Sequence, residues 1–218
     1  MSSKYKQDMQ SNKGRFKTEQ EVFWSGEFGD NYIDRNRSKE LLSANTSLFA
    51  SILSSSGKID SILEFGCNIG MNLESIKSLL PEVKLSGIEI NKKAISKIKN
   101  LEQIEVFHDS ILEIEMDRSF DLTLIKTVLI HINPEELDKV YSRLYKFSNK
   151  YICIAEYYSP SPVEVNYRGH SDRLFKRDFA GELMRKYPDL DLIDYGFIYH
   201  NDPVFPQDDI NWFLLMKK

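Results

Sequence analysis

The sequence predicts an α/β fold built on a mostly parallel β-sheet, and two features of the apolar pattern indicate it. Short apolar runs alternate with amphipathic segments over residues 61–156, which is the strand and helix order of a parallel sheet. The chain then ends in two strand-like runs, at 190–199 and 212–216, joined by a segment with two prolines and no helical pattern. Strands joined by a loop alone pair antiparallel, so we expect the sheet to finish in an antiparallel hairpin.

Local signals set the boundaries of the elements between these landmarks. Pro81 stops the first helix of the sheet region and Pro134 starts a later one, because proline fits the first turn of a helix and not its interior. We expect strands at residues 61–65, 84–90, 104–107, 120–125, 151–156, 190–199 and 212–216, and helices at about 70–80, 91–99 and 134–145.

The composition divides the chain into three segments. Residues 1–15 are polar and lysine-rich, and we expect a disordered leader there. Residues 16–56 mix acidic and aromatic residues and then show helical apolar spacing, which predicts an N-terminal helical cap. Residues 57–218 carry the alternating pattern, and we expect them to form the main domain.

A nucleotide-binding corner is indicated after the first predicted strand. Gly66 and Gly70 follow Glu64 there, and glycine lets the backbone turn and lets a ligand lie against the main chain. Glu89 ends the next apolar run about twenty residues later, where a carboxylate can accept both hydroxyls of a ribose. Ordinary strand-to-helix turn chemistry is the simpler alternative for the glycines alone.

A third strand end carries a polar pair. Asp109 and Ser110 follow the apolar run at 104–107, and they are placed to hold an adenine amino group. Since the carboxyl ends of parallel strands meet at one edge of a sheet, the three strand ends together predict a nucleotide-containing cofactor.

The glycine loop resembles that of the class I S-adenosylmethionine-dependent methyltransferases, written E-x-G-x-G-x-G and here reading Glu64, Gly66, Asn68 and Gly70. Asn68 replaces the middle glycine, and asparagine tolerates a positive φ better than most residues. The resemblance implies a Rossmann-like class I methyltransferase fold with a seven-stranded sheet, an S-adenosylmethionine-binding domain over residues 57–218, and S-adenosylmethionine as the cofactor.

The same resemblance implies roles for individual residues. Gly66, Cys67 and Gly70 would flank the methionine and ribose, Glu89 would take the ribose hydroxyls, and Asp109 with Ser110 would meet the adenine. In the cap, aromatic residues and an arginine would enclose the methionine end. The expected cofactor-binding set is Trp24, Tyr32, Arg35, Glu64, Gly66, Cys67, Asn68, Gly70, Glu89, Ile90, Asp109, Ser110 and Lys126.

Longer motifs cover nearly the whole chain. Residues 18–30, with Tyr32 and Arg35 following, and residues 167–170 and 177–181 are similar to the family of pseudaminic acid biosynthesis-associated methylases. This resemblance implies a methyltransferase of bacterial surface-glycan or capsule biosynthesis. It does not fix the methyl acceptor.

The acceptor is expected to be anionic. The segment 168–178 concentrates cations in a chain whose formal net charge is −4, and arginine forks match phosphate or carboxylate oxygens. A small sugar acid, a nucleotide sugar or a phosphorylated precursor fits, a capsule phosphoramidate precursor among them. The alternative is a solvated charged helix face. The expected acceptor contacts are Tyr158, Arg168, His170 and Arg173.

Methyl transfer needs few catalytic groups, because the sulfonium is already activated. A hydroxyl acceptor, which we favour, has a proton to remove, and His131 and His170 are the candidate catalytic residues. His131 follows the fourth predicted strand, and an equal alternative is that it braces the helix starting near Pro134. His170 lies in a loop poor in apolar residues.

Composition limits the other functions. The acidic balance argues against a nucleic-acid partner, no apolar run approaches the roughly 18 residues of a membrane span, and two cysteines fit a reducing cytoplasm. We expect no metal site, and the oligomeric state is left open. Two alternatives remain: an NAD-dependent oxidoreductase, which the missing third glycine and the terminal hairpin disfavour, and a non-catalytic S-adenosylmethionine-binding sensor or scaffold.

Overall fold

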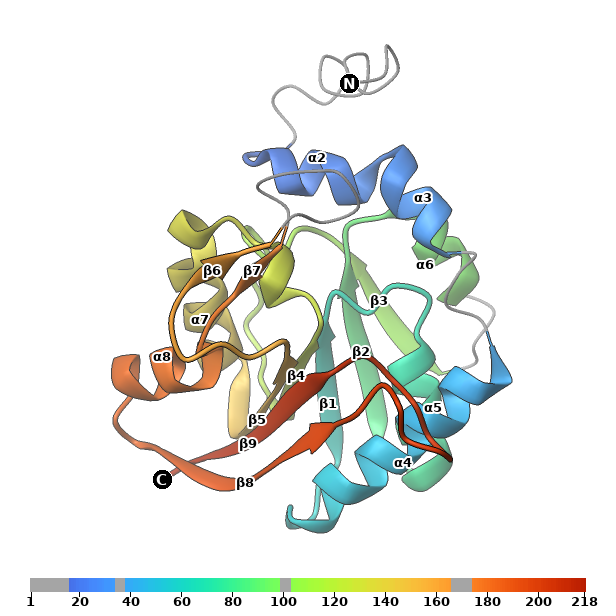
Figure 1. The fold of residues 1–218 in the computed structure, drawn as a ribbon, viewed down its shortest axis with the longest axis vertical. Coiled ribbons are helices and arrows are strands. Elements are labelled where there is room, and N and C mark those ends of the chain that lie inside the picture. Colours follow the sequence, from blue (N-terminus) through green and yellow to red (C-terminus); the bar gives the residue numbers. More distant parts are fainter. Residues whose placement is uncertain (1–15, 34–37, 99–102, 166–173) are drawn as a thin grey trace.

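The computed structural model describes residues 16–33, 38–98, 103–165 and 174–218 (Figure 1). The predicted leader at residues 1–15 lies outside these residues. None of the helices in the described ranges is both long and apolar enough to cross a membrane.

The centre of the fold is a seven-stranded sheet with the strand order β3-β2-β1-β4-β5-β9-β8. The five strands that come first in the chain pair in parallel, and β9 pairs antiparallel with both β5 and β8. The mostly parallel sheet with its antiparallel C-terminal hairpin is thus confirmed. The strands are β1 (Ser61–Phe65), β2 (Lys84–Glu89), β3 (Ile104–His108), β4 (Phe120–Lys126), β5 (Ser148–Glu156), β8 (Leu190–Ile198) and β9 (Ile210–Lys217).

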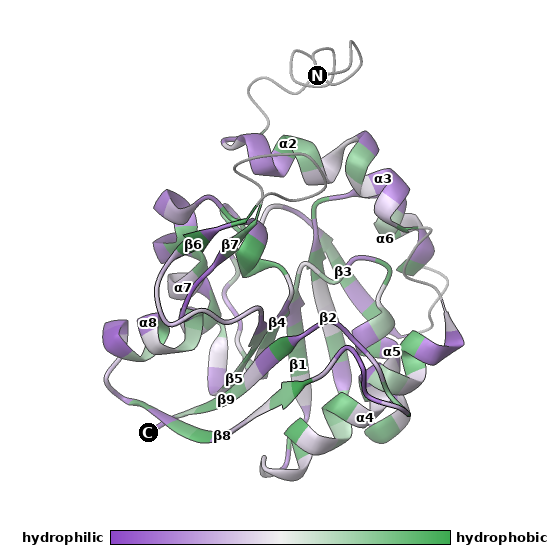
Figure 2. Ribbon diagram, viewed as in Figure 1, coloured by the Kyte–Doolittle hydropathy of each residue, from purple (hydrophilic) through white to green (hydrophobic). Residues whose placement is uncertain are grey.

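Helices cover both faces of this sheet, α7 and α8 on one side and α4, α5 and α6 on the other (Figure 1). Each face has its own core, because each strand of a parallel sheet buries side chains in both directions. Figure 2 shows the hydrophobic residues gathered along the central strands. The helices are α4 (Lys39–Ser54), α5 (Met71–Leu79), α6 (Lys92–Ile98), α7 (Leu137–Lys146) and α8 (Phe179–Lys186), with short 3₁₀ turns η1 (Leu129–His131) and η2 (Pro134–Glu136).

Two further helices, α2 (Glu19–Ser25) and α3 (Glu27–Ile33), cross above the strand ends (Figure 1). Thr18 begins α2 with a capping box, in which its side chain accepts from the Glu21 N–H and the Glu21 carboxylate accepts from the Thr18 N–H. Gly26 separates the two helices in an extended conformation.

The third N-terminal helix, α4, packs differently from α2 and α3. Leu48, Phe49 and Ile52 on α4 are buried in one core cluster with residues of β1 and α5. The predicted cap extends to residue 56, but α4 packs as part of the sheet domain. The elements lying over the strand ends are therefore α2 and α3.

Three elements that the sequence pattern did not predict follow β5. The strands β6 (Val163–Glu164) and β7 (Phe175–Lys176) form a short antiparallel pair, and α8 begins at Asp178, whose side chain accepts from the Gly181 N–H. The charged residues of this segment hid the apolar side of α8, on which Phe179 and Leu183 are buried.

Candidate cofactor and acceptor site

One cavity of about 600 Å³ lies at the carboxyl ends of the central strands. Its walls come from α2, α3 and α4, from the turns after β1 to β4, and from the connection between β8 and β9. This is where an open parallel sheet binds ligands.

The turn after β1 takes the left-handed conformations that the glycine loop requires. The φ angles are 72° at Gly66, 47° at Asn68 and 82° at Gly70, so the expectation that asparagine sustains the loop is confirmed. A Cβ at Gly66 would lie 2.7 Å from a methyl group of Val128. Glycine therefore also lets the turns after β1 and β4 approach each other.

Glu89 is held rigidly at the end of β2. One carboxylate oxygen accepts from the Asn68 N–H and the other from the Asn91 N–H, each at 2.7 Å. Burial raises the pKa of Glu89, while these backbone donors oppose the shift. Each carboxylate oxygen can accept a second hydrogen bond, so Glu89 retains acceptors for two hydroxyls.

A buried charge cluster lies at the ends of β1, β4 and β5. Glu64 accepts from the Asn72 amide at 2.6 Å, and burial raises its pKa to about 7. Burial also raises the pKa of Glu156 to about 8. Lys126 lines the cavity; burial lowers its pKa, and the attraction of Glu64 works in the opposite direction.

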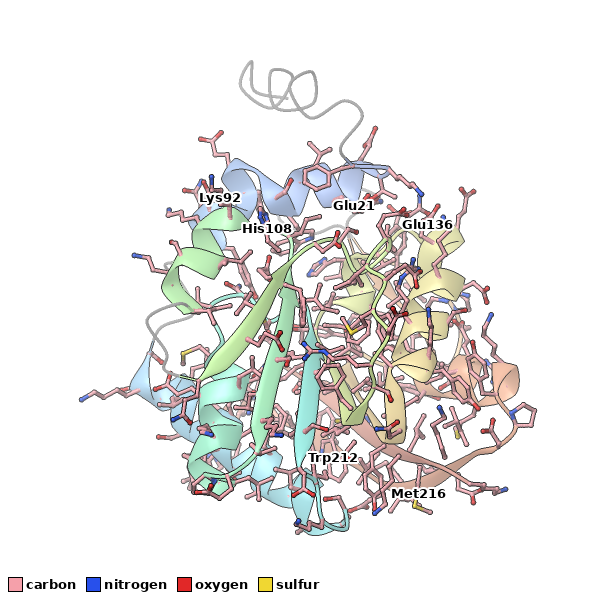
Figure 3. The ribbon with its side chains drawn as sticks, turned by 180° about the vertical axis from the view of Figure 1, so that it is seen from behind. Glu21, Lys92, His108, Glu136, Trp212 and Met216 are labelled. Carbon is pink, nitrogen blue, oxygen red and sulfur yellow. The ribbon has the colours of Figure 1, made fainter. Side chains whose placement is uncertain are left out.

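The cap helices are tied to the turns that carry these groups. The Ser110 hydroxyl donates to Glu21 on α2 at 2.5 Å, and the Asn91 amide donates to the Trp24 carbonyl at 3.1 Å and to Asp30 at 3.0 Å. Figure 3 labels Glu21 where α2 crosses the strand ends. The cap thereby brings Trp24 over the cavity.

The cavity fits a polar cofactor, on the evidence of its unsatisfied atoms. Four residues of its lining hold a buried polar atom without a hydrogen-bond partner in the described part of the chain: Trp24 (Nε1), Asn45 (Oδ1), Asn68 (Oδ1) and Gln207 (Oε1). Folded proteins rarely leave such atoms unpaired. One donor and three acceptors are thus available to a ligand with several hydrogen-bonding groups.

Most of the sequence-predicted cofactor residues in the described ranges line this cavity. They are Trp24, Tyr32, Gly66, Cys67, Asn68, Glu89, Ile90, Asp109, Ser110 and Lys126, together with the candidate base His131. Glu64 and Gly70 do not contribute to its lining; Glu64 pairs with Asn72, and Gly70 precedes α5.

Five other predicted residues fall elsewhere or outside the described ranges. Tyr158 is 43% exposed, bridges to Arg177 and does not line the cavity. The others, which lie outside the residues that the structure describes, are Arg35, Arg168, His170 and Arg173.

Two predicted residues show contacts that bear on their roles. Cys67 is buried, and burial raises the pKa of its thiol. A Cβ at Gly87 would lie 2.4 Å from the Cys67 sulfur, so the thiol packs against β2. The ring of His131 lies 4.6 Å from that of Trp24, between centroids, which links the end of η1 to the cap.

Sequence reasoning missed the connection between β8 and β9. His200, Pro206, Gln207 and Asp208 from this loop line the cavity. The signal was available in the topology, because β8 runs parallel to β4 through its pairing with β9, so its carboxyl end faces the same edge. Asn45 and Asn91 were missed as well.

Residues 62–150 match the family model described as a methyltransferase domain. No curated protein matches the chain in sequence. Among solved structures, the chain is similar to the plantazolicin methyltransferase BpumL in complex with S-adenosyl-L-homocysteine, with 17% identity, a TM-score of 0.63, and coverage of 99% of this chain and 98% of that one.

Two further structures show the same fold. The N-methyltransferase NodS from Bradyrhizobium japonicum WM9, with S-adenosyl-L-homocysteine, is 15% identical with a TM-score of 0.60 and coverage of 86% of this chain and 97% of that one. Magnesium protoporphyrin IX methyltransferase from Synechocystis PCC 6803, with bound S-adenosylmethionine, is 12% identical with a TM-score of 0.62 and coverage of 90% and 94%. The chain therefore has the Rossmann-like class I methyltransferase fold, and residues 62–150 carry its match to the methyltransferase domain model.

Proposed function

We propose that the protein transfers the methyl group of S-adenosylmethionine to a hydroxyl of a small anionic sugar, nucleotide sugar or phosphorylated precursor. The carrying observation is the cavity at the strand ends, which joins a rigid carboxylate, a left-handed glycine loop and four unsatisfied polar atoms in a methyltransferase domain. When bound, the cofactor supplies an activated methyl group.

The residues of this chain bind and orient the cofactor. Glu89 accepts the ribose hydroxyls, the turn from Gly66 to Gly70 lies along the methionine and ribose, and Asp109 lies at the adenine side. Trp24 and Tyr32 close the cavity from the cap and exclude water, and their rings are 5.2 Å apart in an edge-to-face arrangement. Water exclusion strengthens the electrostatic interactions inside the site.

The anionic acceptor is supported by the cations in the segment between β6 and α8. Arg177 is already paired with Glu182, at 2.8 Å, so it is a structural cation. Lys176 lies over the Tyr157 ring at 5.1 Å. Among the cations of this segment, the proposed anion contacts therefore stay Arg168 and Arg173.

The resemblance to the pseudaminic acid biosynthesis-associated methylases supports bacterial surface-glycan or capsule biosynthesis as the pathway of this reaction. A capsule phosphoramidate precursor is then among the candidate acceptors. We place it in the cytoplasm, where the two buried and unpaired cysteines, Cys67 and Cys153, persist as thiols.

A labelled-cofactor screen tests the proposal. The protein is incubated with methyl-labelled S-adenosylmethionine and with UDP-glucuronic acid, glucose 6-phosphate and a phosphoramidate sugar precursor, each beside its neutral counterpart, and products are read by mass spectrometry. Methylation of the anionic member is expected. Preference for the neutral member would contradict the anionic acceptor.

Substitution of Arg168 sharpens the same screen. Arg168→Ala should lower kcat/KM by about ten- to a hundredfold with unchanged cofactor affinity, as expected for loss of one charge-assisted bond. Arg168→Lys should recover part of this loss, because a point charge does not reproduce a planar fork. Arg185→Ala, on the exposed side of α8, is the matched control and should leave kcat/KM unchanged.

A peptide acceptor is the second candidate. It is favoured by the structure of BpumL in complex with a pentazolic desmethyl-plantazolicin analogue. The match to that structure covers 100% of both chains, at 19% identity and a TM-score of 0.60. The pentazolic desmethyl-plantazolicin analogue in the same screen tests it. Binding of NAD in place of S-adenosylmethionine would support the oxidoreductase alternative, and cofactor binding without any turnover would support the sensor.

A further inference from the structure

The connection between β8 and β9 brings a histidine to the cavity from the half of the sheet that carries none of the proposed ribose and adenine contacts. The proposed ribose and adenine contacts come from the ends of β2 and β3, whereas His200 follows β8 at the opposite end of the strand order. His200 nevertheless lines the same cavity as Lys126 and His131. It therefore approaches from the side left for the acceptor.

The Asp209 carboxylate contacts both the imidazole ring and the backbone N–H of His200. Its carboxylate oxygens lie 2.9 and 2.8 Å from Nδ1 of the His200 ring, and one of them also accepts from the His200 backbone N–H at 2.9 Å. An ionised carboxylate can only accept hydrogen bonds. Nδ1 therefore carries a proton and donates it to Asp209.

The second ring nitrogen has the complementary partner. The side-chain amide nitrogen of Asn201 lies 2.9 Å from Nε2 of His200. An amide N–H₂ group donates and does not accept, so Nε2 presents its lone pair. Both neighbours thus select the same tautomer of the neutral ring, with the proton on Nδ1 and the lone pair on Nε2. That lone pair faces the side-chain amide of Asn201, whose place an acceptor hydroxyl would take.

The charges around this pair keep Asp209 ionised. Hydrogen bonds from the His200 side chain and backbone lower the pKa of Asp209, and the charge of Lys176, on β7, adds to this effect. Asp208, the neighbouring residue, lines the cavity beside Lys126 and interacts electrostatically with it. The His200 side chain is 54% exposed, so a released proton can reach solvent.

We propose that His200 is the general base of the methyl transfer and that Asp209 is the residue that positions it. The proposal rests on the proposed function and adds the group that removes the proton of the acceptor hydroxyl. Ionised carboxylate and phosphate oxygens carry no proton to remove and would need no such base. Nε2 takes the hydroxyl proton, and the oxygen uses that electron pair to bond the methyl carbon. The carbon–sulfur bond breaks with its electrons going to sulfur, and the imidazolium later gives the proton to water.

The tautomer is tested without any acceptor, by NMR of the full-length protein labelled with ¹⁵N-histidine. The chain has four histidines, and the signals that disappear in His200→Gln identify His200. We expect the neutral form with Nδ1 protonated in the wild type and a mixture of tautomers in Asp209→Asn. A wild-type ring protonated on Nε2 overturns the proposal.

Kinetics with UDP-glucuronic acid and glucose 6-phosphate test the catalytic step. Because general-base catalysis contributes about 10²- to 10⁴-fold, His200→Gln should lower kcat by at least about 100-fold, with KM and cofactor affinity unchanged. The fall of kcat toward acid pH, where a histidine base becomes protonated, should also disappear in this variant. In His131→Gln that acid fall should remain.

Two carboxylate variants distinguish a role of Asp209 in positioning His200 from a role in bracing the β8–β9 loop. Asp209→Asn keeps an oxygen for the His200 backbone N–H but loses the carboxylate, and it should lower kcat by at least about tenfold. Asp202→Asn is the control, because the Asp202 carboxylate braces the same loop through the Val204 and Phe205 N–H groups and does not line the cavity. Equal losses in both would overturn the positioning role.

The outcomes distinguish this proposal from the one it rests on. If the wild type methylates neither anionic acceptor, the proposed acceptor class fails, and the NMR tautomer alone decides whether His200 is set up as a base. If the wild type methylates one of them and His200→Gln retains the wild-type kcat, the proposed function stands and His200 is not the base.

Discussion

The hydroxyl of Ser110, after β3, donates a 2.5 Å hydrogen bond to the carboxylate of Glu21 on α2, a residue 89 positions earlier in the chain. The other oxygen of Glu21 accepts from the Thr18 N–H and closes the capping box. One buried carboxylate therefore both begins the cap helix and fastens it to the turn beside the predicted adenine site.

Ser110→Ala should loosen the cap without unfolding the sheet domain. The change leaves one oxygen of Glu21 buried without this donor, at a cost of about 1–3 kcal/mol. Amide hydrogen exchange of α2 should accelerate, and S-adenosylmethionine should dissociate faster. Ser96→Ala, whose hydroxyl donates to the Lys93 carbonyl within α6, is the control. Unchanged exchange in α2 would mean that other contacts hold the cap.

Asn68→Gly and Asn68→Val should have opposite consequences. Asn68 has a φ of 47°, which glycine adopts freely and a β-branched residue adopts only with strain. We expect Asn68→Gly to leave the melting temperature near that of the wild type and Asn68→Val to lose about 1–2 kcal/mol of stability.

Thermal unfolding measures this pair of variants. Asn211→Val is the matched control, because Asn211 lies in β9, where valine fits the extended backbone. Equal destabilisation by glycine and valine at position 68 would show that the side chain of Asn68, and not its backbone conformation, matters.

Glu89→Ala should weaken S-adenosylmethionine binding by about 1–3 kcal/mol, the range for leaving polar partners unsatisfied. Glu89→Gln should restore little of this affinity. Its amide would set an N–H₂ group against the backbone N–H of Asn68 or Asn91, each of which donates to Glu89 at 2.7 Å. Calorimetry gives both affinities. Glu105→Ala, on the exposed surface of the neighbouring strand β3, is the control, and wild-type affinity in Glu89→Ala would remove Glu89 from the ribose site.

Local signals explain why much of the fold could be predicted. The strand β1 has the predicted bounds, and α5 ends before Pro81, because apolar runs, glycines and prolines act within a few residues. The left-handed conformation of Asn68 also follows from the residue type and its place in the glycine loop.

Contacts between distant segments explain what could not be predicted. Ser110 was assigned to the adenine, and its sequence gives no sign that its hydroxyl bonds to Glu21. The pairing of His200 with Asp209 depends on the hairpin closing, which brings residues on either side of the loop together. The helix α8 was missed because its apolar residues are spaced among charges.

Glu156→Gln should flatten the pH dependence of stability between about pH 5 and pH 8. Glu156 is 2% exposed, and one of its oxygens accepts from the Val128 and Leu129 N–H groups, each at 2.8 Å. These bonds hold the turn after β4, in which Thr127 has a φ of 55°. Glutamine keeps a carbonyl oxygen for both donors and cannot ionise.

The raised pKa of Glu156 determines whether its contribution to stability grows or falls as the pH rises. Burial raises this pKa from 4.5 to about 8, so between these values the folded state binds a proton that the unfolded state has released. Stability from this group is therefore fully present below the unfolded pKa and is lost as the pH rises through the folded pKa. A tenfold difference in proton affinity between the two states corresponds to about 1.4 kcal/mol, so the total effect is on the order of a few kcal/mol.

Denaturant unfolding of the wild type and Glu156→Gln across this range measures the difference. The variant should gain stability relative to the wild type as the pH rises, and part of the slope should remain, because the pKa of Glu64 is raised to about 7 by its own burial. Adding Glu64→Gln to the Glu156→Gln variant should remove more of the remaining slope of stability against pH. The exposed Glu82→Gln is the control, and a wild-type slope in Glu156→Gln would mean that Glu156 stays ionised in the folded protein, held so by Lys126 and the two backbone donors.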